Sequence, residues 1–263
     1  MTANKEIFQH FHPDEFSFIE KMSDFIIRVE NTYLIQVTEF LNPRQIEILK
    51  ILVSASGNKC YASTDLYGTE YGRVIIAPDY YELNEDDFDI ALIEIKYNAK
   101  FNQISHGQIL GTLINELGIK RSLLGDILIE DGYAQIFINR KHLSYFLGNI
   151  TKIARTSVSL KEVSLDQMIK PVKDEETIDI TVSSLRVDRL LASVLKLSRS
   201  QSMKLIQSEK VKVNYRTGIR SSDILSVGDL ISVRGFGRFK LLKDNGYSKN
   251  GKHKLSLSTT IHK

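Results

Sequence analysis

The sequence contains no tryptophan, one cysteine and only four prolines among its 263 residues. The lone Cys60 can form neither an intramolecular disulfide nor a cysteine-rich metal site, and we expect no metal or cofactor. No run of 18 apolar residues occurs, and the polar N-terminus does not resemble a secretory signal, so neither membrane insertion nor export is expected. These absences predict a cytoplasmic protein.

Opposite charges dominate the two parts of the chain. Residues 1–182 contain 18 Lys and Arg against 27 Asp and Glu, a net charge of −9, whereas residues 183–263 contain 17 against 5, a net charge of +12. Apolar residues make up 42% of the sequence, which is typical of folded proteins. The basic C-terminal third therefore suggests a polyanionic partner for that part.

The pattern of apolar residues predicts an α+β protein with three domains. Residues 1–72 predict an N-terminal helical domain: apolar side chains recur every three or four residues from Ile19 to Val29, and Asn42-Pro43 can begin a further helix. Residues 164–181 are polar, with Pro171 and an acidic run, and predict a linker.

Residues 73–163 predict a central ferredoxin-like (split βαβ) domain. Apolar segments and turn signals give the order strand, helix, strand, strand, helix, strand. A short strand at residues 73–77 comes first in this region. The strands of the split βαβ order cover residues 90–95, 127–129, 134–138 and 156–163, and its helices begin at Ser105 and near residue 140. Proteins that bind RNA use this architecture, but so do many unrelated ones.

Residues 182–263 predict a small α+β domain with a phosphate-binding surface. Apolar residues from Val187 to Leu195 form one helical stripe, and Ser198 with Gln201 has the form of a capping box before a second helix. A capped helix N-terminus presents free backbone N–H groups to phosphate, and Arg199 in that first turn is expected to point into solvent. The predicted RNA-binding residues are Arg186, Arg189, Ser198, Arg199, Ser200, Gln201, Lys204, Lys210, Lys212, Asn214, Arg216, Arg234 and Arg238.

The segments Leu185–Ala192, Ser198–Gln201, Val211–Asn214 and Val227–Val233 resemble, in that order, the S4 RNA-binding domain of small-subunit ribosomal protein four. The resemblance implies that residues 182–263 form an S4 domain with additional C-terminal strands. Tyr215 occupies a position where the family usually has glycine. Because a turn with positive φ tolerates tyrosine poorly, we expect this turn to differ.

The segments Ile104–Gly111, Gly118–Arg121, Gly125–Ile127 and Arg234–Phe239 resemble the bacterial YlmH family over nearly the full length. That resemblance implies a helical domain, a ferredoxin-like RNA-binding domain and an S4 domain. It also implies a non-enzymatic factor that binds ribosomal RNA and tRNA on the large ribosomal subunit in ribosome-associated quality control. Cell-division proteins are further partners that it suggests.

Two other functions stay open from the sequence. An RNA-modifying enzyme of the pseudouridine synthase or methyltransferase type could use the basic domain to hold its substrate, and a cell-division scaffold could act through the acidic helices. The catalytic candidates are weak: His106 has no evident partner, Cys60 has no His or Asp constellation, and Asp188 suits a first helical turn.

Overall fold

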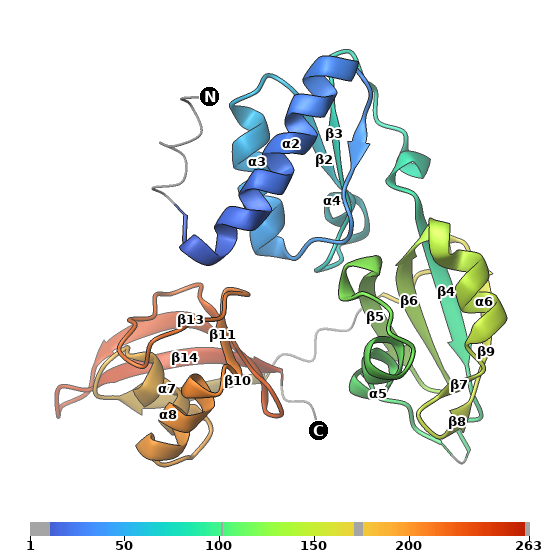
Figure 1. Ribbon diagram of the computed structural model, residues 1–263. Coiled ribbons are helices and arrows are strands. Elements are labelled where there is room, and N and C mark those ends of the chain that lie inside the picture. The colour runs from blue at the N-terminus through green and yellow to red at the C-terminus, as the bar shows by residue number, and fades with distance from the viewer. Residues whose placement is uncertain (1–10, 101, 171–175, 261–263) are drawn as a thin grey trace. The chain divides into compact units, whose positions relative to one another are not determined.

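The computed structural model describes residues 11–100, 102–170 and 176–260, and the chain divides into two compact units, Met1–Pro171 and Val172–Lys263 (Figure 1). Within the described residues, no helix has the length and apolar character that crossing a lipid bilayer requires. Each unit has its own hydrophobic core.

The first unit begins with two helices packed on a small sheet. Helices α2 (Phe16–Thr32) and α3 (Pro43–Ser54) bury their apolar stripes, and Asn42 caps α3 through a box with Gln45. The helical prediction for this region is confirmed, but it omits a sheet of order β1-β3-β2. Its strands are β1 (Gln36–Val37), β2 (Lys59–Ala62) and β3 (Val74–Ala77).

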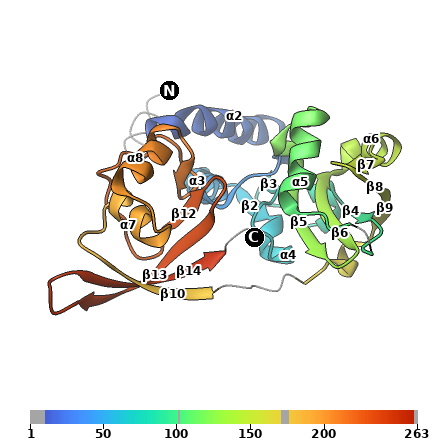
Figure 2. The same ribbon diagram turned by 90° about the horizontal axis from the view of Figure 1, so that it is seen from below.

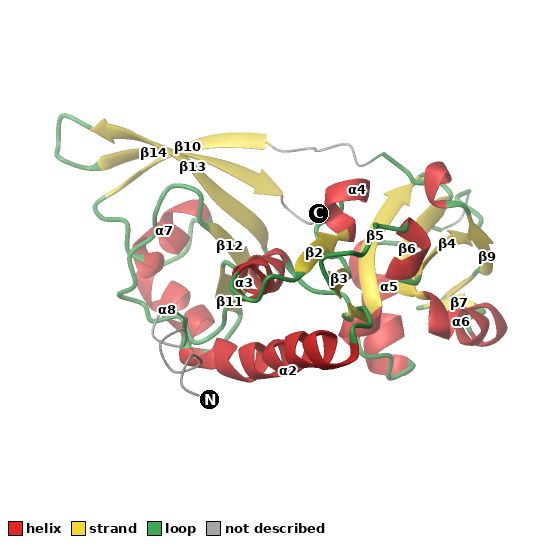
Figure 3. Ribbon diagram, turned by 90° about the horizontal axis from the view of Figure 1, so that it is seen from above, coloured by secondary structure: helices red, strands yellow, loops and turns green. Residues whose placement is uncertain are grey.

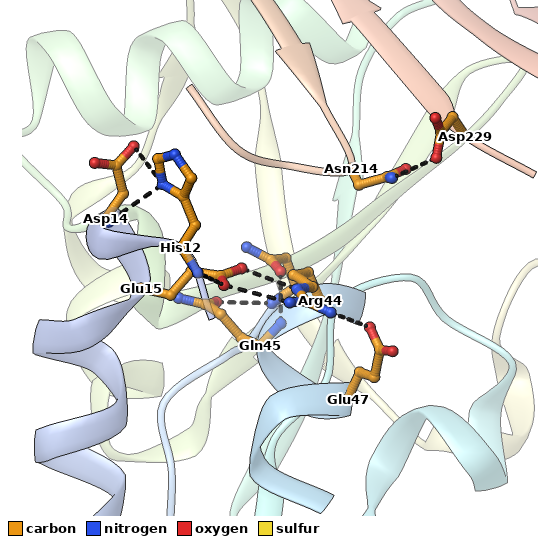
Figure 4. A network of polar contacts seen from close by, with 9 residues as sticks. His12, Asp14, Glu15, Arg44, Gln45, Glu47, Asn214 and Asp229 are labelled. Atoms are coloured by element: carbon orange, nitrogen blue, oxygen red, sulfur yellow. Dashed lines mark hydrogen bonds and ion pairs between the residues drawn. The ribbon is translucent and has the colours of Figure 1, made fainter. Parts of the chain in front are cut away.

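An ion pair fixes the start of α2 against α3. Nε of Arg44 donates to Oε1 of Glu15 at 2.9 Å, and Glu15 is only 8% exposed (Figure 4). The hydrogen bond that Arg44 donates to Glu15 is the largest cause that raises the pKa of Arg44, so this guanidinium stays charged. The second partner of Arg44 is Glu47, one turn further along α3.

The central part of the first unit has the predicted split βαβ topology, because its four strands lie in the order β5-β6-β4-β9 and all neighbours are antiparallel. The elements are β4 (Ile90–Lys96), α5 (His106–Gly111), β5 (Leu124–Glu130), β6 (Tyr133–Asn139), α6 (Leu143–Asn149) and β9 (Ser159–Val163). The strand predicted at residues 73–77 forms as β3, but its assignment to the central domain is wrong. It pairs with β1 and β2, and β4 is the first strand of the central sheet.

The central sheet is covered on both faces. Helices α5 and α6 pack on one face, where Ile93 and Ile136 join Phe146 in one cluster. On the other face, Leu92 and Phe137 pack against Phe40 from the N-terminal part. Gly125 lies at this contact, since a Cβ there would come within 2.6 Å of the Phe40 ring. The N-terminal part thus occupies the sheet face that many RNA-binding domains use for base stacking.

The short elements of the first unit connect these layers. They are η1 (Pro13–Glu15), α4 (Ser63–Tyr67), η2 (Glu85–Phe88), η3 (Thr112–Glu116), η4 (Arg121–Leu123), η5 (Arg140–His142), β7 (Lys152–Ile153), β8 (Thr156–Ser157) and η6 (Leu165–Gln167). The predicted linker 164–181 is structured at both ends. The side-chain nitrogen of Gln135 donates to the Gln167 carbonyl at 2.9 Å, and residues 176–182 form a strand. Pro171 and the acidic residues 174 and 175 lie outside the described residues.

The second unit is a five-stranded sheet of order β10-β14-β13-β12-β11 with both helices on one face (Figure 3). Its elements are β10 (Glu176–Val182), α7 (Val187–Val194), α8 (Arg199–Gln207), β11 (Val211–Val213), β12 (Leu230–Val233), β13 (Gly237–Tyr247) and β14 (His253–Thr260). The predicted stripe of α7 is buried through Val187, Leu190 and Leu191, against Leu255 and Leu257 of the sheet.

Candidate nucleic-acid interface

A fully buried carboxylate holds two of the predicted RNA-binding arginines. Asp188, in the first turn of α7, is 0% exposed. Nε of Arg186 donates to its Oδ1 at 3.0 Å, and Nη2 of the same residue donates to Oδ2 at 3.1 Å. Nε of Arg199, the first residue of α8, donates to Oδ2 at 3.0 Å. One carboxylate therefore joins the starts of both helices.

This geometry decides the charge state of Asp188. Burial alone would raise the pKa of Asp188, but the hydrogen bonds from Arg186 and Arg199 outweigh it, so the pKa lies below its ordinary value. The first-turn position expected for Asp188 is confirmed. The expectation that Arg199 points into solvent is confirmed, since its side chain is 55% exposed, but the bond from its Nε to a buried acid was not predicted.

A cationic pocket lies beside this cluster. It has a volume of about 330 Å³ and presents Arg189, Arg199 and Lys252 together with serine and threonine hydroxyls. The guanidinium of Arg189 is oriented by a 2.7 Å bond from Nη1 to the Ser183 hydroxyl. The full lining is Thr181, Val182, Ser183, Arg189, Ala192, Ser193, Arg199 and Lys252. Three cations and several hydroxyl donors are a suitable set for a phosphate group.

Sequence reasoning missed Lys252, which lies 53 positions after Arg199. It belongs to the turn between β13 and β14, and the register of these strands brings it to the pocket. The signal was the Asn250-Gly251 pair between two segments that form strands, which is typical of a hairpin turn.

The predicted cations do not form one continuous side of the second unit. Val211 and Val213 of β11 pack in the core with the helices, so Lys212 between them lies on the opposite sheet face. Lys212 pairs with Ser232, and Ser232 pairs with Arg238, which puts Arg238 on the same outer face. The expectation of a single cationic surface is therefore wrong, since Arg189 and Arg199 lie on the helix side.

A further group of the predicted cations lies where α8 ends. Lys204 is in the last turn of α8, and Lys210 follows the helix with its backbone N–H bonded to the Leu205 carbonyl. The backbone N–H of Arg234 donates to the Lys210 carbonyl at 2.8 Å, so the chain segments at Lys210 and Arg234 are adjacent.

Several polar residues of the predicted site hold the backbone. Ser198 and Gln201 form the predicted capping box at α8, and the hydroxyl of Ser200 lies 3.5 Å from that of Ser198. The side chain of Asn214 donates to Asp229 at 2.8 Å (Figure 4). It also accepts from the Leu230 N–H at 2.9 Å. Asn214 is thus a structural residue of the turn after β11.

The turn at Asn214-Tyr215 keeps positive φ despite the tyrosine. Asn214 has φ 49° and Tyr215 has φ 67°, and Val213 and Arg216 exchange backbone hydrogen bonds on either side of them. The expectation that this turn would differ because of Tyr215 is therefore wrong. The two-residue hairpin turn forms, and a non-glycine residue bears the left-handed conformation.

The other chemical candidates are poor nucleophiles or ligands. Burial is the largest cause that raises the pKa of Cys60 to about 11, so this thiol is protonated near neutral pH. Across residues 11–100, 102–170 and 176–260, the structure brings no three His, Cys, Asp or Glu side chains together as metal ligands.

Two family models match the chain in tandem. Residues 14–81 match the N-terminal domain of YlmH, and residues 84–167 match a domain described as "Putative RNA-binding domain in YlmH". The chain is also 32% identical over 251 residues to Ribosome-associated protein quality control protein P2 of Bacillus subtilis, covering 95% of this chain and 97% of that protein.

The chain belongs to the YlmH family. A solved structure titled Cell division protein ylmH from Streptococcus pneumoniae is 42% identical, with a TM-score of 0.55, and the match covers 61% of this chain and 98% of that one. Neither YlmH model extends beyond residue 167, so the cationic pocket lies outside the residues that they match.

Proposed function

We propose that this YlmH-family protein is an RNA-binding factor that acts on the ribosome in protein quality control. The family models and the Bacillus relative support RNA binding and association with ribosomes. Ribosomal RNA and tRNA on the large subunit are the partners that we assign, and residues 176–260 are the part that we expect to grip them, as an S4-type domain.

The pocket with Arg189, Arg199 and Lys252 is the single observation that carries the proposal. Arginine forks fit phosphate oxygens in a bidentate manner, and Asp188 fixes the direction of Arg199 before RNA arrives. A preordered cation loses less side-chain entropy on binding than a free one. The pocket is thus suited to a sugar-phosphate backbone, and less suited to reading base edges.

We further propose that the protein binds RNA without modifying it. A general acid or base needs a pKa near the working pH. Asp188 is the fully buried acid of the cationic site, and its two arginines hold its pKa below the ordinary value. It therefore suits the orientation of arginines rather than proton transfer. An assay of base modification on purified ribosomal RNA tests this, and a modified base would contradict it.

Co-sedimentation with purified large ribosomal subunits at low salt tests the assignment to the ribosome. The full chain is expected in the subunit fractions, and Arg189→Glu/Lys252→Glu is expected at the top of the gradient. A matched control reverses two exposed cations of α2, Lys21→Glu/Arg28→Glu, and should leave the protein with the subunit. Wild-type protein that stays at the top would overturn the assignment.

A cell-division role is the second candidate, since the streptococcal structure carries that title. A scaffold of this kind would keep its protein partners when RNA is removed. A pull-down with and without ribonuclease separates the two functions. Partners lost with ribonuclease support the ribosomal proposal, and division proteins retained after it support the scaffold.

A further inference from the structure

The hairpin of β13 and β14 carries an exposed aromatic side chain near its turn. Its tip projects beyond α7 and α8 (Figure 2). Tyr247, the last residue of β13, is 68% exposed, although tyrosine rings usually gain from burial. An aromatic side chain left in solvent on a projecting, basic hairpin is a candidate contact for a planar partner.

The ring of Tyr247 is held in place. It packs on the His253 ring, with the centroids 4.7 Å apart and an interplanar angle of 49°. Nδ1 of His253 lies 2.9 Å from a carboxylate oxygen of Asp244, which fixes the imidazole. One face of the tyrosine is thus supported by protein, and the exposure of the side chain leaves room for a partner.

This aromatic pair stands on the same side of the sheet as the cationic pocket. His253 alternates with Leu255 and Leu257, which face the helices, so His253 shares their face. Val182 of β10 pairs with His253 and also lines the pocket. Lys252, the neighbour of His253 in the chain, is one of the three cations of that pocket.

The charges around the pair favour an anion. Lys249 and Lys252 lie in the tip, and Arg189 and Arg199 lie in the pocket. The nearby acid on this hairpin, Asp244, is bonded to His253. A ligand that fits both features has a flat aromatic part and an attached phosphate, which describes a nucleotide.

We propose that Tyr247 and the pocket together bind one unpaired nucleotide of RNA. Its base stacks on Tyr247, and its phosphate lies among Arg189, Arg199 and Lys252. The inference rests on the proposed RNA binding and adds to it a requirement for an unstacked base. A base inside a duplex keeps its own stacking neighbours, so the site selects bulges, loops or single strands.

A tryptophan reporter tests the contact directly. Because the chain has no tryptophan, Tyr247→Trp places the only indole of the full-length protein at the site. Its emission should be quenched by a uridine oligomer and not by a blunt RNA duplex. Tyr80→Trp is the matched control, since Tyr80 is 66% exposed in the other unit, and its emission should not change. Unchanged emission of the Tyr247→Trp variant while labelled uridine oligomer binds the same protein would overturn the inference.

Affinity measurements separate this inference from the proposed function. Tyr247→Ala should weaken binding of the uridine oligomer by about 5- to 150-fold, the range for loss of one stacked base, and Tyr247→Phe should retain it. Binding of the duplex should be equal in both variants. Wild-type protein that binds neither RNA would overturn the proposed function itself. Equal affinity of wild type, Tyr247→Ala and Tyr247→Phe for the oligomer would overturn only the nucleotide site. The same holds if Tyr247→Ala loses a contact with a ribosomal protein and no affinity for RNA.

Discussion

The two larger sheets of the molecule share one design and differ in what covers them. Both are antiparallel, and both carry two helices on one face. The second face of the central sheet packs against the N-terminal part through Phe40 and Phe137. The corresponding face of the C-terminal sheet presents Lys212 and Arg238.

This difference shows that an RNA-binding type of topology does not by itself provide an RNA-binding face. In the central domain the sheet serves the hydrophobic core, so any RNA contact there must use loops, helices or edges. In the C-terminal unit the charges are preordered by Asp188, and hydroxyls surround them. We therefore expect the C-terminal unit to supply most of the binding energy.

The largest effect on stability is expected at the face of the central sheet that the N-terminal part covers. Phe137→Ala removes a side chain that is 2% exposed and should lower the free energy of unfolding by about 3–5 kcal/mol. RNA affinity below the melting temperature should not change. Thermal melting and RNA binding check both parts, with Phe236→Ala in the second unit, 36% exposed, as the mild control. Lost RNA affinity in the folded variant would show that this sheet does contact RNA.

The next effect concerns the buried acid of the C-terminal unit. Asp188→Asn replaces hydrogen bonds between charged groups and should lower the free energy of unfolding by about 2–3 kcal/mol at neutral pH. The half-buried Asp223, bonded to the exposed Arg220, is the control, and Asp223→Asn should lower the free energy of unfolding by less than about 1 kcal/mol. Equal losses at the two sites would contradict the central role of Asp188.

The same acid gives a pH dependence with a defined sign. The folded pKa of Asp188 lies below the unfolded value of about 3.9, so its stabilisation is complete above that value and is lost as the pH falls through the folded pKa. The difference in unfolding free energy between wild type and Asp188→Asn should therefore shrink below about pH 4. Denaturant unfolding at several pH values measures it. A difference that grows on acidification would mean that the pKa of Asp188 is higher in the folded state than in the unfolded state, which would contradict the prediction.

A smaller effect compares the cations of the two regions. Arg189→Glu should weaken binding to ribosomal RNA about 10-fold and reduce the slope of log affinity against log salt by about 1, because a phosphate contact is lost. Arg155→Glu, an exposed site between β7 and β8 of the central domain, should weaken it less. A larger loss for Arg155→Glu would place the main phosphate contacts in the central domain.

The smallest effect tests the strained turn. Tyr215→Gly and Tyr215→Ala both remove the ring, but only glycine adopts a φ of 67° without a penalty. The glycine variant should be about 1 kcal/mol more stable than the alanine variant. Chemical denaturation of the two proteins is the measurement, and equal stability would mean that the turn changes conformation.

Local signals in the sequence were sufficient for most elements. The stripe of α7, the capping box at Ser198 and the N-cap at Asn42 could be predicted, because each depends on residues close together in the chain. The topology of the central sheet followed from the order of its strands and helices along the chain. The sheet to which β3 belongs could not be predicted. A strand of four buried residues fits the core of either sheet, and the choice depends on contacts with β1 and β2.

The site was only partly predictable for the same reason. Arg189 and Arg199 follow from helix patterns and basic charge, whereas Lys252 reaches them through the register of a hairpin far along the chain. The role of Asp188 required knowing that both helix starts converge on one carboxylate. The spacing from Asp188 to Arg199 contains no signal for that contact.

Photocrosslinking of the full-length protein to ribosomal RNA, followed by mapping of the crosslinked peptides, compares the two regions in a single measurement. We predict crosslinks within residues 183–260, including the peptides with Arg189, Arg199 and Tyr247, and few in the central sheet. Crosslinks confined to residues 84–167 would contradict the assignment of RNA binding to the C-terminal unit.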